Sequence, residues 1–103
     1  MLVTKKYQKD TIVSFKLVNG DEIVAKVIDE TETGFVVSKP TTVIPSSQGM
    51  GLVQSLFTGD VNKHITVDKR HIMMDSPSVK EIENHYIQTT TGIQPVSQNG
   101  IIT

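Results

Sequence analysis

Three consecutive basic residues, Lys69, Arg70 and His71, could together contact a phosphate group. They follow Asp68 directly and lie between two short apolar segments, which predicts a tight charged turn between two strands. Phe35, at the start of another predicted strand, could offer a face for base stacking. In the other interpretation, Phe35 belongs to the hydrophobic core and the charged turn is only solvated.

Patterns that would indicate catalysis or metal binding are weak. His64, Asp68 and His71 lie close in sequence, but strand alternation gives them no fixed ligand geometry. Gly49-Met50-Gly51 lacks the Lys-Ser/Thr pair of a phosphate loop. The sequence has no cysteine nucleophile and no Gly-x-Ser-x-Gly elbow, and its acidic residues at 29–32 crowd a turn. We therefore predict a protein that is not an enzyme and uses no metal and no cofactor.

Length and composition exclude several classes of protein. With 103 residues, of which 37% are hydrophobic and 20% charged, the chain is long enough for one small domain. A net charge of -1 excludes a broad basic surface, so nucleic acid would have to bind a local cluster. The absence of cysteine, of a signal pattern and of an apolar run near ~18 residues predicts a cytoplasmic protein without a membrane span.

Residues 12–39 predict three consecutive antiparallel strands. Val13, Phe15 and Leu17 alternate with other positions, which gives the first strand one wholly apolar face. Asn19-Gly20 follows, and this pair favours the tight turn of a β-hairpin because both central residues need a positive φ. A second turn leads into the third strand.

Residues 41–57 predict a long hairpin that projects beyond the other strands. Pro40 and Pro45 cannot donate to a ladder, so this part of the chain either lies at a sheet edge or pairs only on one side. The hairpin has more apolar side chains than a free ribbon can hide: Val43, Ile44, Met50, Leu52, Leu56 and Phe57. A neighbouring subunit is one way to cover them, and the chain's own helix is another.

Two shorter strands, over 63–67 and 71–74, precede a predicted helix over 76–90. Ser76 followed by Pro77 is typical of a helix N-terminus, where the missing proline N–H costs nothing. Three apolar residues at helical spacing predict the face that packs on the strands: Val79, Ile82 and Tyr86.

The whole chain is predicted to be a single, mainly β domain. A polar lead over 1–11 carries three lysines, which form either an arm that touches phosphate or a solvated terminus. The strands occupy 12–74, and a loosely held tail over 92–103 follows the helix.

Two segments resemble the sequence motifs of Sm-like proteins. Phe15–Gly20 followed by Ile23 is similar to the first motif, and Leu17-Val18-Asn19-Gly20 is the form found in bacterial host-factor proteins. Ile65–Ile72 resembles the second motif, which spans two strands and the turn between them. More narrowly, the chain resembles the small Sm-like proteins attributed to cyanophages. The resemblance covers residues 12–39 and 63–74.

The resemblance implies a strongly bent five-stranded SH3-like barrel, here with a long hairpin between strands three and four and a C-terminal helix. In this family, strand four of one subunit pairs with strand five of the next, closing a ring of roughly five to seven protomers. A closed ring leaves no strand edge exposed. The predicted subunit interface comprises Ile65, Val67, Ile72, Leu52, Leu56 and Phe57.

The resemblance also implies binding of single-stranded RNA, here by Lys69, Arg70, His71 and Phe35. The match is incomplete, because the turn before Phe35 lacks the family's base-reading asparagine. An aspartate also precedes Lys69 where the family has arginine. The alternative function is that of a homo-oligomeric structural or scaffolding protein, phage-related, that docks partners through the 41–57 hairpin. A monomeric SH3-like domain is the third interpretation.

Overall fold

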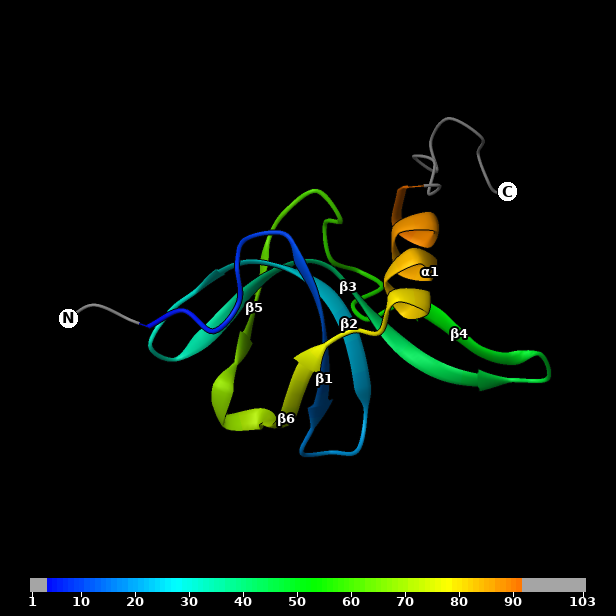
Figure 1. Cartoon of the computed structure of the whole chain (residues 1–103), viewed down its shortest axis with the longest axis horizontal. Coiled ribbons are helices and arrows are strands. Elements are labelled where there is room, and N and C mark those ends of the chain that lie inside the picture. Colours follow the sequence, from blue (N-terminus) through cyan, green and yellow to red (C-terminus); the bar gives the residue numbers. More distant parts are fainter. Residues whose placement is uncertain (1–3, 92–103) are drawn as a thin grey trace.

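The computed structural model describes residues 4–91 and consists of one antiparallel sheet followed by one helix (Figure 1). The six strands are β1 (Thr11–Leu17), β2 (Glu22–Glu30), β3 (Gly34–Ser46), β4 (Gly49–Gln54), β5 (Ile65–Asp68) and β6 (Ile72–Pro77). A short 3-10 helix, η1 (Lys69–His71), joins the last two strands, and α1 (Lys80–Thr91) follows them. The prediction of a mainly β fold with a C-terminal helix is confirmed.

The sheet is strongly bent but does not close within residues 4–91. Its strand order is β4-β3-β2-β1-β6, and β5 also pairs with β3. The 13-residue β3 is shared: its first part pairs with β5 and its last part with β4. Within residues 4–91, β5 and β6 do not pair with each other, so the sheet is not closed and the expected five-stranded SH3-like barrel is not confirmed.

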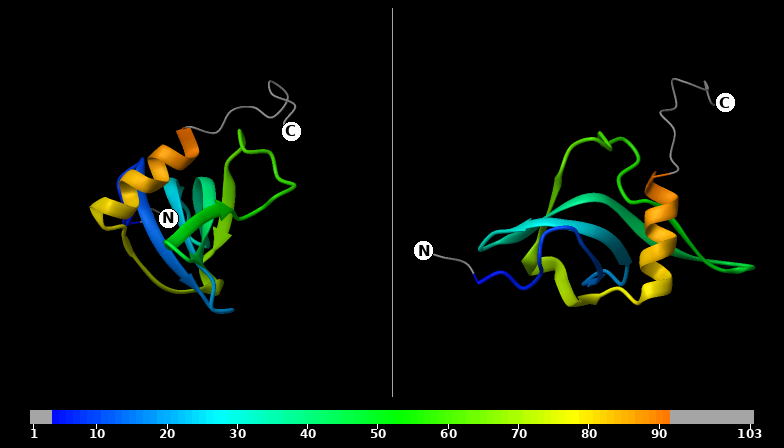
Figure 2. Two further views of the ribbon diagram at one scale, coloured as in Figure 1. Left: turned by 90° about the vertical axis from the view of Figure 1, so that its right-hand side faces the viewer. Right: turned by 45° about the horizontal axis from the view of Figure 1, so that its top comes forward.

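The two faces of the sheet carry separate hydrophobic clusters because side chains alternate along each strand. The inner cluster comprises Val13, Phe15, Ile23, Ala25, Val27, Phe35 and Val37, with Tyr7 packed against it. The outer cluster comprises Ile12, Val24, Leu52 and Tyr86, with Ile82 packed against it. Helix α1 therefore covers one face and the N-terminal segment covers the other (Figure 2).

The helix begins four residues later than the sequence pattern predicts. β6 continues to Pro77, which pairs with Val13, so Ser76 lies in a strand and is not a helix cap. Proline is tolerated there because it ends an edge strand. Tyr86 and Ile82 pack on the sheet as predicted, but Val79 is 66% exposed, which makes that part of the predicted stripe wrong.

The last two strands also differ in their bounds from the prediction. β5 starts at Ile65 and ends at Asp68, where strand four was expected over 63–67. β6 covers Ile72–Pro77, where strand five was expected over 71–74. The predicted tail, 92–103, lies outside the described residues.

Tyr86 fixes the helix to a distortion in β3. The β2–β3 register shifts between Val24 and Lys26, so Lys39 and Pro40 together lie opposite Ala25. The Tyr86 hydroxyl is 2.7 Å from the Ser38 carbonyl oxygen and accepts a bond from the Lys26 N–H at 3.2 Å. Lys39 has a φ of 49°, in the left-handed region that usually holds glycine. The bulge and the helix are therefore built around one buried hydroxyl.

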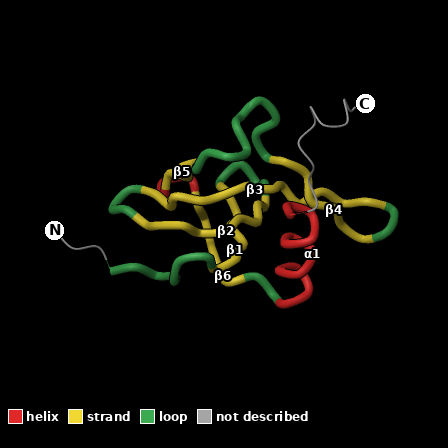
Figure 3. The backbone as a smooth tube through the Cα atoms, turned by 90° about the horizontal axis from the view of Figure 1, so that it is seen from above, coloured by secondary structure: helices red, strands yellow, loops and turns green. Residues whose placement is uncertain are grey.

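The predicted hairpin forms, and α1 covers its base. β3 and β4 pair from Thr41 with Gln54 to Ser46 with Gly49, and the hairpin projects past α1 (Figure 3). Leu52 is buried in the outer cluster with Tyr86, so the chain's own helix, and not a neighbour, covers it. Leu52 is therefore not free to serve as the predicted subunit contact. Leu56 and Phe57 follow β4 and remain exposed.

Candidate nucleic-acid interface

Two loops meet at the end of the sheet where the sequence places its basic cluster. The N–H of Lys69 donates to the carbonyl of Thr33 at 2.8 Å, so η1 lies against the β2–β3 turn. Gly34 makes this approach possible, because a Cβ there would lie 2.8 Å from both the Thr66 Cγ2 and the Val67 carbonyl oxygen. The loops over 31–33 and 69–71 therefore form one continuous surface.

Arg70 points outward from this surface and is bound to a carboxylate. Its side chain is 84% exposed, and its Nη2 lies 2.7 Å from Oδ2 of Asp68. Asp68 also accepts the backbone N–H of Arg70 at 2.8 Å, which caps η1. These hydrogen bonds from the Arg70 side chain and backbone lower the pKa of Asp68 to about 2. Arg70 is accessible to a phosphate, but Asp68 offsets much of its charge.

Lys69 points inward instead. Its Nζ lies 2.8 Å from Oε2 of the buried Glu30 and 5.2 Å from the centre of the Phe35 ring. Phe35 is 3% exposed, with its ring centre 5.3 Å from that of Phe15. Phe35 is therefore a core residue, and its expected role as an open stacking face is wrong for this chain. Lys69 is engaged with Glu30 rather than free to bind phosphate.

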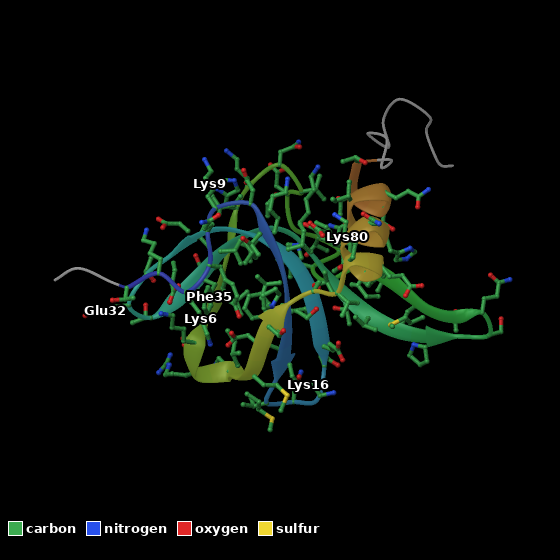
Figure 4. The ribbon with its side chains drawn as sticks, in the orientation of Figure 1. Lys6, Lys9, Lys16, Glu32, Phe35 and Lys80 are labelled. Carbon is green, nitrogen blue, oxygen red and sulfur yellow. The ribbon has the colours of Figure 1, made fainter. Side chains whose placement is uncertain are left out.

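The N-terminal segment lies over this inward-facing pair. The Lys6 N–H donates to Oε1 of Glu30 at 2.7 Å, and the Lys6 ammonium is 2.8 Å from Oδ1 of Asp75. The Tyr7 hydroxyl also donates to Asp75, and its ring centre lies 6.0 Å from that of Phe35. Figure 4 shows Lys6 and Phe35 at the same end of the sheet. The lead is neither a free arm nor a solvated terminus along this stretch.

The carboxylates beneath the N-terminal segment are held in their charged forms. Burial raises the pKa of Glu30, but hydrogen bonds from the Lys6 N–H and the Lys69 ammonium outweigh it and leave the pKa below its usual range. The same balance, with bonds from Lys6 and Tyr7, lowers the pKa of Asp75. Burial, the bond to Asp75 and nearby negative charge raise the pKa of Tyr7. The segment is thus fixed by charged hydrogen bonds.

Sequence reasoning missed this network for a physical reason. Glu30 and Asp75 lie in different strands, and neither falls in a motif or a periodic pattern. The one signal was Tyr7, an aromatic residue inside a polar, lysine-rich stretch. The sequence position of an isolated aromatic residue does not indicate which residue it contacts in the fold.

The histidines contribute little defined geometry. The His71 carbonyl accepts the Val18 N–H at 2.8 Å, while its side chain is exposed beside Arg70. Among residues 4–91, no three histidine, aspartate or glutamate side chains are grouped so that they could hold a metal ion. In the same part of the chain, no helix has the length and apolar character needed to cross a membrane.

The structure brings Lys69, Arg70 and His71 to one turn but separates them by direction. Of the predicted interface residues, Ile65, Val67 and Ile72 are half-buried beside the inner cluster.

No protein-family model matches the chain, and no curated protein sequence matches it.

Proposed function

We propose that this chain is a ring-forming Sm-like protein that binds single-stranded RNA at the surface formed by loops 31–33 and 69–71. The observation that supports this most directly is the bond between the Lys69 N–H and the Thr33 carbonyl. It joins the two loops that carry the RNA contacts in the family whose motifs the sequence resembles. A cytoplasmic location suits a chain without cysteine.

The proposed ring forms through the strands that lack a second neighbour. Among the described residues, β5 pairs only with β3, and β6 pairs only with β1. Each therefore presents a row of backbone groups that another strand can satisfy. Pairing β5 of one copy with β6 of the next would complete the SH3-like barrel and give both strands a second neighbour all around the ring. Among the described residues, β4 would then keep the one remaining free edge.

Two exposed methionines mark the outer edge of β6. The β1–β6 register shifts between Lys16 and Leu17, and at this irregularity Met73 and Met74 are 61% and 62% exposed. Adjacent exposed apolar side chains on an unpaired edge are a feature that monomeric proteins avoid. A neighbouring β5 would cover them.

Adding charge at this edge tests the ring. We expect the unmodified protein to give one closed oligomer of about five to seven subunits in native mass spectrometry. The double variant Met73→Lys/Met74→Lys should be monomeric, because lysines on an edge strand oppose strand addition. Met50→Lys, at the similarly exposed hairpin tip, is the matched control and should keep the ring. A monomeric unmodified protein at micromolar concentration would refute the proposal.

The proposed RNA contacts are Arg70 and His71, because Lys69 and Phe35 are engaged within the chain. Repetition around a ring would place several guanidinium groups on one rim. Charge-assisted bonds to phosphate are stronger than neutral hydrogen bonds, and repeated contacts release several counterions and give a strong salt dependence.

Arg70 and its carboxylate give tests of opposite sign. Arg70→Ala should weaken binding of oligo-uridine or oligo-adenosine roughly tenfold or more and flatten its salt dependence. Asp68→Asn should tighten binding, because the amide still caps η1 while the competing charge is removed. Lys80→Ala removes one exposed lysine on α1 and should change nothing (Figure 4). Fluorescence anisotropy at several salt concentrations measures all three. Equal affinities for the Arg70 and Lys80 variants would refute the RNA site.

The hairpin supports the second candidate, a structural or scaffolding oligomer of the phage-related kind. Ile44 and Met50 near its tip remain exposed, and Phe57, which follows β4, is 78% exposed. If Met50→Lys dissociates the oligomer while Met73→Lys/Met74→Lys does not, assembly runs through the hairpin. A ring that binds neither oligo-uridine nor oligo-adenosine would also favour this candidate.

A further inference from the structure

A cavity lies away from the two loops, 31–33 and 69–71. Its volume is about 250 Å³, and it is lined by β3 and β4, the loop over 55–64, the start of β5 and the last turn of α1. The loop and the end of α1 lie on the same side of the sheet in Figure 1. Lys39 is five residues along β3 from Gly34, so roughly 16 Å of strand separates this cavity from the loop surface. It is a separate candidate site.

The loop that forms one wall is fixed to the sheet. The Ser55 N–H donates to the Pro40 carbonyl at 3.0 Å, and the Ser55 and Thr42 hydroxyls are 2.8 Å apart. The Gln54 amide donates to the Leu56 carbonyl at 2.8 Å, and Oδ1 of Asp60 accepts the Asn62 N–H at 2.9 Å. The wall is therefore formed before any ligand arrives, which lowers the entropic cost of binding.

Lys39 occupies a backbone position that favours glycine. Its φ of 49° is unfavourable for a residue with a Cβ, and such strain concentrates at functional sites. Tyr86 explains why the bulge exists, since its hydroxyl bonds the carbonyl just before it. It does not explain why a lysine, rather than glycine, stands at the bulge. A second lysine, Lys63, lines the same cavity. Neither lysine forms an ion pair within residues 4–91.

The cavity combines three kinds of surface. Pro40, Leu56, Val61 and Ile65 give it apolar walls. Lys39 and Lys63 both line the cavity, and these two basic residues, which favour an anion, outnumber its single acidic residue, Asp60. Thr89 and Thr90, in the last turn of α1, also line the cavity. The end of a helix carries backbone carbonyls, which are hydrogen-bond acceptors with partial negative charge. A matching ligand has a flat apolar group, one anionic group and hydrogen-bond donors.

We propose that this cavity binds a nucleoside monophosphate. Its base fits the apolar walls, its phosphate the two lysines, and its sugar hydroxyls the acceptors of Asp60 and α1. The volume is just below the range of about 300–1,000 Å³ usual for drug-sized ligands, which suits one nucleotide unit. The nucleotide can be free or can belong to a longer strand.

Titration of isotope-labelled protein with uridine or adenosine monophosphate, followed by NMR, tests the site. We expect saturable shifts of the amide signals of Lys39 and Thr41 and of residues 54–65 and 89–90. Lys63→Ala and Lys39→Gly should each weaken binding at least fivefold. Lys39→Gly also relieves the unfavourable φ, so this variant should be at least as stable as the unmodified protein, and a thermal melt verifies this. A loss of affinity can then not be attributed to unfolding. Lys80→Ala is the matched control and should bind normally.

Further arms separate this site from the RNA surface and from simpler chemistry. Arg70→Ala should leave mononucleotide binding unchanged, so the two proposals can fail independently. Uridine and inorganic phosphate should each bind more weakly than uridine monophosphate. Binding of oligo-uridine with the same shifts identifies a strand as the source, and binding of the monophosphate alone identifies a free nucleotide. The proposal would be overturned if inorganic phosphate bound as tightly as uridine monophosphate. It would also be overturned if no amide signal shifted at a ligand concentration of about 10 mM, because any binding would then be too weak to matter.

Discussion

Replacing Tyr86 with alanine should lower the free energy of unfolding by about 3–5 kcal/mol. Tyr86 is the largest fully buried side chain in the described structure and is 1% exposed. Its ring fills the space between α1 and the outer face of the sheet, and its hydroxyl bonds Ser38 of β3, next to the bulge, and Lys26 of the facing β2. The variant leaves a cavity and removes these bonds together. Urea unfolding followed by circular dichroism measures the loss.

Two further variants divide this effect into its parts. Tyr86→Phe keeps the ring and should cost about 1–3 kcal/mol, because the Lys26 N–H loses its acceptor. Val79→Ala, at an exposed position just before the helix, should change stability by less than about 0.5 kcal/mol. A loss below about 1 kcal/mol for Tyr86→Ala would mean that α1 does not pack on the sheet in solution.

Replacing Glu30 with alanine should cost about 3–5 kcal/mol, because it leaves a charged partner without its counter-charge in a partly buried place. The Lys69 ammonium and the Lys6 N–H both depend on this carboxylate. Glu30→Gln keeps an acceptor of the same shape and should cost less. Lys5→Ala breaks only an exposed ion pair, with Asp29, and serves as the control with little effect. Equal stabilities for the Glu30 and Lys5 variants would contradict the network.

The same network predicts loss of stability in acid. The pKa values of Glu30 and Asp75 are lower in the folded chain than their ordinary values of 4.5 and 3.8. Their stabilisation is therefore complete above about pH 5, and it is lost as the pH falls through the lower folded values. Urea unfolding at a series of pH values measures this loss. Glu30→Gln should have a flatter acid limb, and an unchanged limb would exclude Glu30 as its source.

Local patterns predicted the strands whose partners are near in sequence. The alternation over 12–18 and the Asn19-Gly20 pair predicted the β1–β2 hairpin, and this hairpin forms. The expected type of turn is wrong, because Gly20 has a positive φ of 97° and Asn19 does not. The helix start was misplaced because Ser76-Pro77 favours a helix only when no strand competes for it. Here β1 offers backbone partners from Val13 to Leu17, and pairing with it outweighs the local signal.

The sequence predicts the turn that carries the basic residues, but it does not predict the direction in which each side chain points. The sequence indicates that Lys69 and Arg70 share a turn, and that turn exists as η1. Whether a side chain points to solvent depends on what lies opposite, and Glu30 is 39 residues away from Lys69. Arg70 has its carboxylate two residues away, so that pairing could have been foreseen from spacing alone. Contacts over long sequence separations are the ones that pattern reasoning cannot supply.

The order of the elements has a consequence for how the chain folds during synthesis. The inner face of the sheet is covered by a segment that precedes β1, so its cover is made before the strands. The outer face waits for α1, which is made after every strand. Until Tyr86 leaves the ribosome, Ile12, Val24 and Leu52 have no cover on that side. The growing chain therefore passes through a stage in which the inner face of the sheet is covered and the apolar outer face is still exposed to solvent. A chaperone could shield that exposed face.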